Sequence, residues 1–113
     1  MFDSIIKEFK KDDKIKLLTK GKYDTYIGIT STKVNGKSYD KAILFEISKT
    51  NKKRITSEFI ELTYNYYKEN NNCFPKRDWY ETHKELSHEY KSRPCNYAVA
   101  QGLINKVLTS KNN

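Results

Sequence analysis

The stretch "TSTKVNGKSYDK", residues 30–41, predicts a β-hairpin. Asn35-Gly36 lies between two β-prone arms, and this dipeptide in such a setting is the strongest short-range hairpin signal that a sequence offers. The arms around the turn carry Thr, Ser, Lys and Asp, with almost no large apolar side chain. Beyond Ile29 the hairpin therefore has nothing to pack on a core, and we expect it to project from the domain.

The apolar side chains of the two arms favour one register. They alternate along the first arm at Tyr23, Thr25, Ile27 and Ile29, and along the second at Lys41, Ile43, Phe45 and Ile47. A two-residue turn would place Ile27 opposite Leu44 and scatter the apolar side chains over both faces. A three-residue loop, residues 34–36, pairs Ile27 with Ile43 and gathers them on one face, because paired residues share a face. We therefore expect the three-residue loop, with Gly36 at the left-handed bulge position.

Two lysines come close together near the hairpin tip in either register. The three-residue loop pairs Lys33 with Lys37, and like charges facing each other across strands are destabilising. An anionic partner would relieve this repulsion, since Thr, Ser, Lys and Asn side chains suit phosphate and base-edge contacts. The alternative is a solvated hairpin whose lysines only block edge-to-edge pairing of sheets.

Positive charge is concentrated in the first half of the chain. The net charge of the 113 residues is +8. Residues 1–54 hold 14 Lys and Arg against 7 Asp and Glu, whereas residues 55–113 hold 8 against 7. An uneven basic excess indicates a polyanionic partner, of which nucleic acid is the commonest. A lysine-rich composition caused by codon usage is the alternative, but codon usage alone would not favour one half.

The remaining periodicity predicts an α+β fold in a single domain, residues 1–113. A short helix follows Asp3, and "KIKLLT", residues 14–19, predicts a strand that completes a three-stranded antiparallel sheet with the hairpin. Residues 55–108 predict three helices in series, the first capped by Thr56 or Ser57. The predicted architecture is a helix and basic hairpin over residues 1–54, a helix-turn-helix unit over 55–108 and a tail over 109–113.

The third predicted helix has one broad apolar side and one side of small and polar residues. The second side carries Ala98, Gln101, Gly102, Asn105 and Lys106. Asn and Gln can pair bidentately with adenine, and small neighbours let a helix approach a base edge. Glycine in a helix interior costs about 1 kcal/mol, so Gly102 needs a reason. Close packing on another helix and close approach to DNA are both reasons of this kind.

The order of elements resembles winged helix-turn-helix DNA-binding proteins over residues 14–108. The hairpin and the ending "SRPCNYAVAQGLINKV", residues 92–107, are similar to the small winged-helix relaxosome accessory proteins of conjugative plasmids. This resemblance implies binding to double-stranded repeats near an origin of transfer, no catalysis, and assistance to the relaxase. In an ordinary winged helix the wing follows the recognition helix, whereas this hairpin precedes all three helices. The usual docking of a helix in the groove therefore does not carry over directly.

We expect the hairpin to be the main DNA-contacting element and the third helix to contribute less, because the lysines cluster in the strand region. The expected DNA-contacting residues are Lys20, Lys22, Thr32, Lys33, Asn35, Lys37, Lys41, Arg93, Gln101, Asn105 and Lys106.

No pattern in the sequence predicts an enzyme, a metal site or a cofactor. His83 and His88 are five residues apart and do not share a helix face as paired metal ligands would, and His83 lies on an aromatic stripe typical of a core. Cys73 and Cys95 are expected to be free thiols. No apolar run is long enough to span a membrane and no signal peptide is evident, so a cytoplasmic protein is expected.

The functional prediction is therefore sequence-specific binding of double-stranded DNA as an accessory factor of a mobile element. A transcriptional regulator of a plasmid or phage follows from the same physical features. A protein-interaction module acting through its tyrosines is the alternative of a different class. Two-fold operators commonly meet dimeric proteins, so a homodimer is one expectation, although no heptad pattern shows how it would pair.

Overall fold

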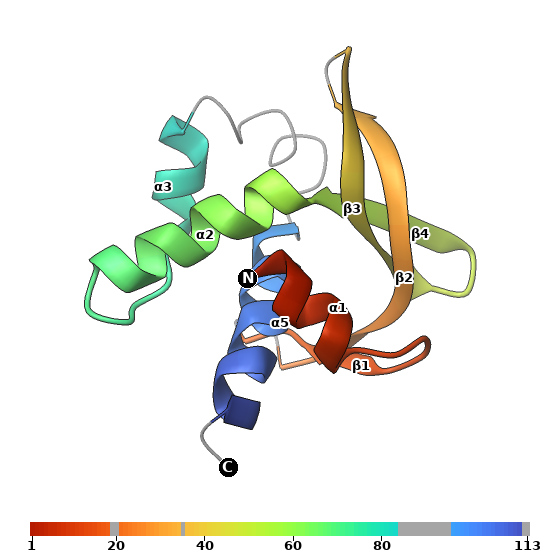
Figure 1. Ribbon diagram of the computed structural model, residues 1–113, viewed down its shortest axis with the longest axis horizontal. Helices are drawn as coiled ribbons and strands as arrows, with labels where there is room; N and C mark the ends of the chain where they lie inside the picture. The colour runs from red at the N-terminus through yellow and green to blue at the C-terminus, as the bar shows by residue number, and fades with distance from the viewer. Residues whose placement is uncertain (19–20, 35, 84–95, 112–113) are drawn as a thin grey trace.

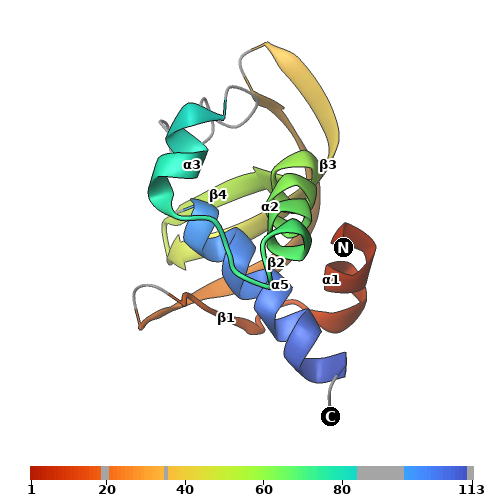
Figure 2. The ribbon, with the colours of Figure 1, turned by 90° about the vertical axis from the view of Figure 1, so that its left-hand side faces the viewer.

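The computed structural model describes residues 1–18, 21–34, 36–83 and 96–111 and has an α+β fold (Figure 1). The elements are α1 (Phe2–Glu8), β1 (Lys14–Lys16), β2 (Tyr23–Val34), β3 (Lys37–Ser48), β4 (Asn51–Thr56), α2 (Ser57–Glu69), α3 (Arg77–Thr82) and α5 (Asn96–Lys111). The strands form one antiparallel sheet in the order β1-β2-β3-β4. Helices α2 and α5 lie on one side of this sheet (Figure 2).

The sheet has four strands where the sequence predicted three. The additional strand, β4, turns back from β3 through the pair Ser48 and Asn51. Its first four residues are polar and at least partly exposed, and only Ile55 and Thr56 are buried. The strand therefore lacks the apolar alternation by which strands are recognised in a sequence.

The predicted register of the long hairpin is wrong. The turn contains two residues, since Val34 pairs with Lys37 and Lys33 pairs with Ser38. Gly36 has φ +82°, a left-handed conformation that glycine adopts without a steric penalty. Two register shifts, between Thr30 and Thr32 and again between Tyr26 and Gly28, adjust the pairing further down. The two shifts offset one another, so Tyr26 pairs with Phe45 as it would with a two-residue turn alone.

The two-residue turn also changes which face of β2 is buried, because it pairs Tyr26 with Phe45. Asp24 and Tyr26 are buried, whereas Tyr23 is 58% exposed and Ile29 is 54% exposed. The predicted buried face of the first arm is therefore wrong. On β3 the prediction is confirmed, because Ile43 and Phe45 are fully buried.

The core lies between the sheet and the helices, with α5 at its centre. Every residue from Ala98 to Ile104 is buried, and α5 contacts α1, α2 and β1. The other fully buried large side chains are Ile5, Ile15, Leu17, Ile43, Phe45, Ile55, Phe59, Ile60 and Tyr80. Over Ala98–Ile104 the helix is buried, so this part of α5 cannot present the exposed face that a recognition helix needs.

The predicted three-helix unit matches the structure only in part. Helix α2 begins as predicted, with the Thr56 side chain accepting a hydrogen bond from the backbone N–H of Phe59 at 3.2 Å. This N-cap satisfies one of the free donors at the helix start. Helix α3 ends at Thr82, and residues 84–95, which belong to the predicted three-helix region, lie outside the described residues.

Candidate nucleic-acid interface

The end of the β2–β3 hairpin projects from the body of the molecule (Figure 1). We define the hairpin tip as residues 31–41. No described side chain in the tip is buried, and Thr32, Val34 and Tyr39 are half-buried while the other described side chains are exposed. The sequence prediction of a hairpin that extends beyond the core is confirmed. Its predicted residue Asn35 lies outside the described part of the chain.

The lysines of the tip point to different faces of the hairpin. Lys33 pairs with Ser38, and Lys37 pairs with Val34, so the two lysines lie on opposite faces because successive side chains alternate. The predicted pairing of Lys33 with Lys37, and with it the repulsion between them, is wrong. Lys33 and Lys37 can therefore contact a partner from opposite faces of the hairpin.

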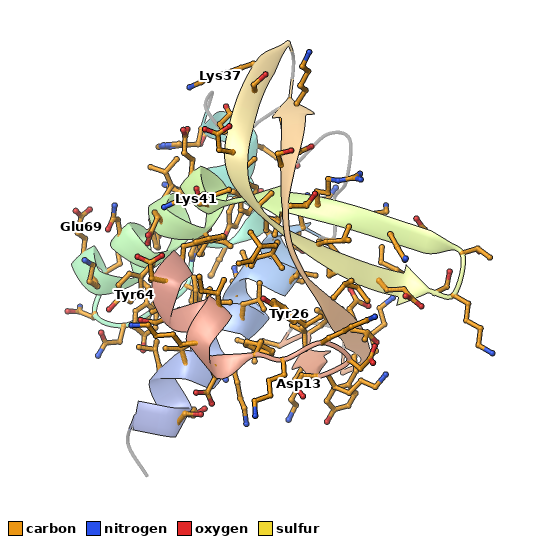
Figure 3. The ribbon with its side chains drawn as sticks, turned by 45° about the vertical axis from the view of Figure 1, so that its right-hand side comes forward. Asp13, Tyr26, Lys37, Lys41, Tyr64 and Glu69 are labelled. Atoms are coloured by element: carbon orange, nitrogen blue, oxygen red, sulfur yellow. The ribbon has the colours of Figure 1, made fainter. Side chains whose placement is uncertain are left out.

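One face of the tip contacts the start of α2. The Lys37 Nζ lies 3.9 Å from the Glu58 Oε1 and 5.1 Å from the centre of the Tyr39 ring. Both charged side chains are more than half exposed, so this ion pair contributes little to stability. Lys37 and Lys41 both lie on β3, with Lys37 near the tip and Lys41 nearer the body (Figure 3).

Gln101 is not available to DNA, contrary to its prediction as a contact residue. The residue is 4% exposed, and its Nε2 donates to the Pro75 carbonyl at 3.0 Å and to the Tyr80 hydroxyl at 3.3 Å. The Tyr80 hydroxyl also hydrogen-bonds the Thr63 hydroxyl at 3.1 Å. A buried amide with these partners holds α5 to the segment before α3. Its role is structural, because buried polar groups are costly unless they are hydrogen-bonded.

Gly102 packs against a strand, a role that the sequence did not predict. A Cβ at this position would overlap the backbone oxygen of Lys16 and lie 3.2 Å from the Ile15 Cγ2. The glycine therefore allows α5 to approach the backbone of strand β1. Neither packing on another helix nor approach to DNA is its reason.

The other predicted contact residues fall into two groups. Lys22 is exposed just before β2, Asn105 is half-buried on α5, and Lys106 beside it is exposed. Lys20 and Arg93 lie outside the described residues. The structure thus brings Thr32, Lys33, Lys37 and Lys41 together on the hairpin and separates them from α5.

Sequence reasoning missed a set of basic residues on the side of the sheet that faces away from α2 and α5, which we call the open side. The cross-strand register aligns Lys14, Thr25, Glu46 and Lys52 in one row, one residue from each strand. Arg54 lies on the same side, because it is two residues from Lys52 along β4. The signal was present in "KTNKKR", residues 49–54, which has four cations in six residues and no acid.

An aromatic cluster covers part of α2 and α3. The Trp79 ring stacks on His83 with centroids 4.5 Å apart and lies 5.1 Å from Tyr66, while Tyr67 lies 4.7 Å from Phe74. His83 therefore belongs to the aromatic stripe, as predicted. Cys73 is an exposed free thiol, and Cys95 lies outside the described residues.

Within the part of the chain that the structure describes, no three His, Cys, Asp or Glu side chains are grouped so that they could hold a metal ion. Among the helices of the same residues, none combines the length and apolar character needed to cross a bilayer. Comparisons with protein-family models, curated proteins and solved structures found no match.

Proposed function

We propose that this chain is a sequence-specific double-stranded DNA-binding protein that contacts DNA chiefly through the β2–β3 hairpin. The proposal rests on the hairpin tip, which projects from the body and whose described side chains, those of Lys33, Lys37 and Lys41 among them, are all at least partly exposed. Ordering a residue costs about 1–2 kcal/mol of backbone entropy, and the tip recovers little of this through apolar burial. A polyanion bound to the lysines would supply the missing stabilisation.

The dimensions and chemistry of a hairpin suit duplex DNA. The major groove is about 12 Å wide and admits either a helix or a two-stranded β-ribbon. The ribbon projects and can enter this groove, whereas α5 is buried over Ala98–Ile104. Lysines of the tip would neutralise phosphates, and the hydroxyls of Thr32 and Ser38 are suited to phosphate or base-edge contacts.

The open side of the sheet carries further positive charge. Lys14, Lys52 and Arg54 lie on this side, with Glu46 as the acidic member of the row. A duplex whose groove receives the hairpin would have its phosphates near this surface. Phosphate contacts contribute affinity and fix the register, so these residues would strengthen binding without specifying sequence.

The biological setting that we propose is a mobile element, with the chain acting as an accessory factor that binds repeats at a transfer origin. The support is the resemblance carried by the hairpin and residues 92–107. A transcriptional regulator would use the same surface. The genomic position of the bound repeat distinguishes these two roles.

Selection from a pool of random duplexes at about 50 and about 200 mM salt, followed by sequencing, tests the proposal. We expect one recurring motif. If the three tip lysines neutralise three phosphates, affinity should fall about 40-fold between these salt concentrations, since each phosphate contributes about −0.9 to the log–log slope. Absence of enrichment at both salt concentrations would contradict DNA recognition and favour a protein-interaction module.

A further inference from the structure

A cleft of about 270 Å³ lies where β1 and α5 meet, and nothing in the proposed hairpin contact accounts for it. Its lining residues are Lys14, Lys16, Tyr23, Gly102, Asn105, Lys106 and Thr109. Lys16 and Lys106 come from its two sides, β1 and α5. We infer that this cleft binds a phosphate group, and that in the complex of the proposed function it holds a backbone phosphate of the duplex.

The charge of the cleft is entirely positive. Three of its seven lining residues are lysines and none carries a carboxylate. Among the described residues, no carboxylate oxygen lies within 4.0 Å of the ammonium group of Lys14, Lys16 or Lys106. The Lys14 Nζ donates to the Thr25 hydroxyl at 3.0 Å, which holds the amine but leaves its charge uncompensated. Like charges held close together repel one another, so a bound anion would stabilise the arrangement.

The shape of the cleft follows from the glycine on α5. Because Gly102 has no side chain, α5 approaches the carbonyl oxygen of Lys16 closely. This approach brings Lys106 on the helix and Lys16 on the strand to the same cleft. Tyr23 and Asn105 add neutral hydrogen-bond donors, which suit phosphate oxygens.

The size of the cleft favours one group of a larger molecule. Pockets that enclose small ligands usually have volumes of about 300–1,000 Å³, and this cleft is smaller. A phosphodiester needs to insert only its phosphate and part of its sugar. A duplex can supply this group while it contacts the hairpin elsewhere.

The position of the cleft is compatible with one continuous duplex. Lys14 and Lys16 alternate with the buried Ile15 and so point away from the core, and Lys14 lies in the same row as Lys52. Strand β1, which lines the cleft with Lys14 and Lys16, lies far from the hairpin tip (Figure 1). The molecule measures 34 Å along the axis that is vertical in Figure 1, the main direction from β1 to the hairpin tip, and one turn of duplex spans about 34–36 Å. The hairpin tip and the cleft could therefore contact the same duplex about one turn of DNA apart.

The first test compares duplex binding by wild type, a cleft variant, Lys16→Gln/Lys106→Gln, and a charge-matched control, Lys7→Gln/Lys76→Gln. Both control lysines are exposed; Lys7 lies on α1 and Lys76 directly precedes α3. We expect the cleft variant to bind at least fivefold more weakly than the control, with a salt slope shallower by about 0.9, the value for one phosphate. Thermal unfolding should show that both variants are folded. Equal affinities and slopes for the two variants would overturn the assignment of the cleft to a backbone phosphate.

The second test does not require DNA binding, so it separates failure of the cleft from failure of the proposed function. Inorganic phosphate is titrated into the protein while NMR follows the backbone amides of Lys16, Gly102 and Lys106, with sodium chloride at equal ionic strength as control. We expect saturable shifts in wild type that the cleft variant lacks. If wild type shows no shifts beyond those caused by chloride, the phosphate site is refuted. If phosphate binds but the cleft variant retains full duplex affinity, the ligand is a free phosphate compound and the inference about DNA is refuted.

Discussion

Gly102 of α5 lies against the backbone carbonyl of Lys16 in β1 so closely that no side chain fits between them. Gly102→Ala should therefore destabilise the protein, although alanine favours a helix over glycine by about 1 kcal/mol. Overpacking a core typically costs about 1–3 kcal/mol, and here the obstacle is backbone that cannot rotate away. We expect a net loss in this range in the free energy of unfolding, measured in urea.

Gly28 provides a matched control for this substitution. It lies in β2, its φ is outside the left-handed region, and a Cβ there would meet nothing within 4 Å. Gly28→Ala should change the free energy of unfolding by no more than about 0.5 kcal/mol, as is usual for positions without special contacts. Equal effects of the two substitutions would show that α5 does not depend on close approach to β1.

Gln101 and Asn105 were both predicted to contact DNA. From the structure, we expect their replacement by alanine to affect stability differently. Gln101→Ala removes a buried amide that bonds Pro75 and Tyr80, and unpaired buried groups cost about 1–3 kcal/mol each. Asn105→Ala alters a half-buried side chain and should change stability by less than about 0.5 kcal/mol. Urea unfolding of both variants measures the difference. If Gln101→Ala retains wild-type stability but loses DNA affinity, the structural role assigned to Gln101 is wrong.

The outcome at Gln101 shows why parts of the fold were not predictable from the sequence. A polar residue beside small residues on a helix has the same pattern whether it faces a base pair or a buried carbonyl. Its partner Pro75 is 26 residues away, so only the tertiary arrangement distinguishes the two cases. The start of α2 was predicted correctly because Thr56 caps it through a contact only three residues away.

In the hairpin, likewise, the position of the turn was predictable from the sequence and the register was not. Asn35-Gly36 placed the turn because turn chemistry is local. The register depended on whether the loop has two or three residues, because a difference of one residue reverses the parity on which face assignments depend. The two register shifts offset one another, so Tyr26 pairs with Phe45 as the two-residue turn alone would place it. The cleft between β1 and α5 was not predictable, because its lysines are about 90 residues apart in the sequence and meet only through the packing at Gly102.

The exposed lysines of the tip should affect binding without affecting stability. Lys33→Gln/Lys37→Gln removes two cations from opposite faces of the hairpin, and the ion pair of Lys37 with Glu58 is exposed and weak. We expect DNA affinity to fall at least tenfold and the salt slope to become shallower by about 1.8, the value for two phosphates. Fluorescence anisotropy with a selected duplex at several salt concentrations measures both quantities. The charge-matched variant Lys7→Gln/Lys76→Gln should keep the wild-type slope, and an equal loss in that variant would mean that only net charge matters.

Tyr80 should make the stability of the fold depend on alkaline pH. Burial raises the pKa of the Tyr80 hydroxyl from 10.0 to about 12, and hydrogen bonds with Thr63 and Gln101 offset only part of this effect. Below pH 10 the hydroxyl is protonated in both the folded and the unfolded chain, so its stabilisation is complete. Between pH 10 and 12 the unfolded chain releases the proton while the folded chain retains it, and the free energy of unfolding should fall by roughly 2–3 kcal/mol.

Comparison with Tyr80→Phe isolates this contribution, because Tyr26, whose pKa is also raised by burial, titrates alike in both proteins. At pH 8 the variant should be less stable by about 1–2 kcal/mol, since the Thr63 hydroxyl and the Gln101 amide each lose a hydrogen-bond partner. The variant has no phenol to ionise at this position, so the difference between the two proteins should shrink, or change sign, as the pH approaches 12. Urea unfolding at closely spaced pH values follows the difference. Parallel pH profiles would mean that Tyr80 titrates normally and is accessible to solvent in the folded protein.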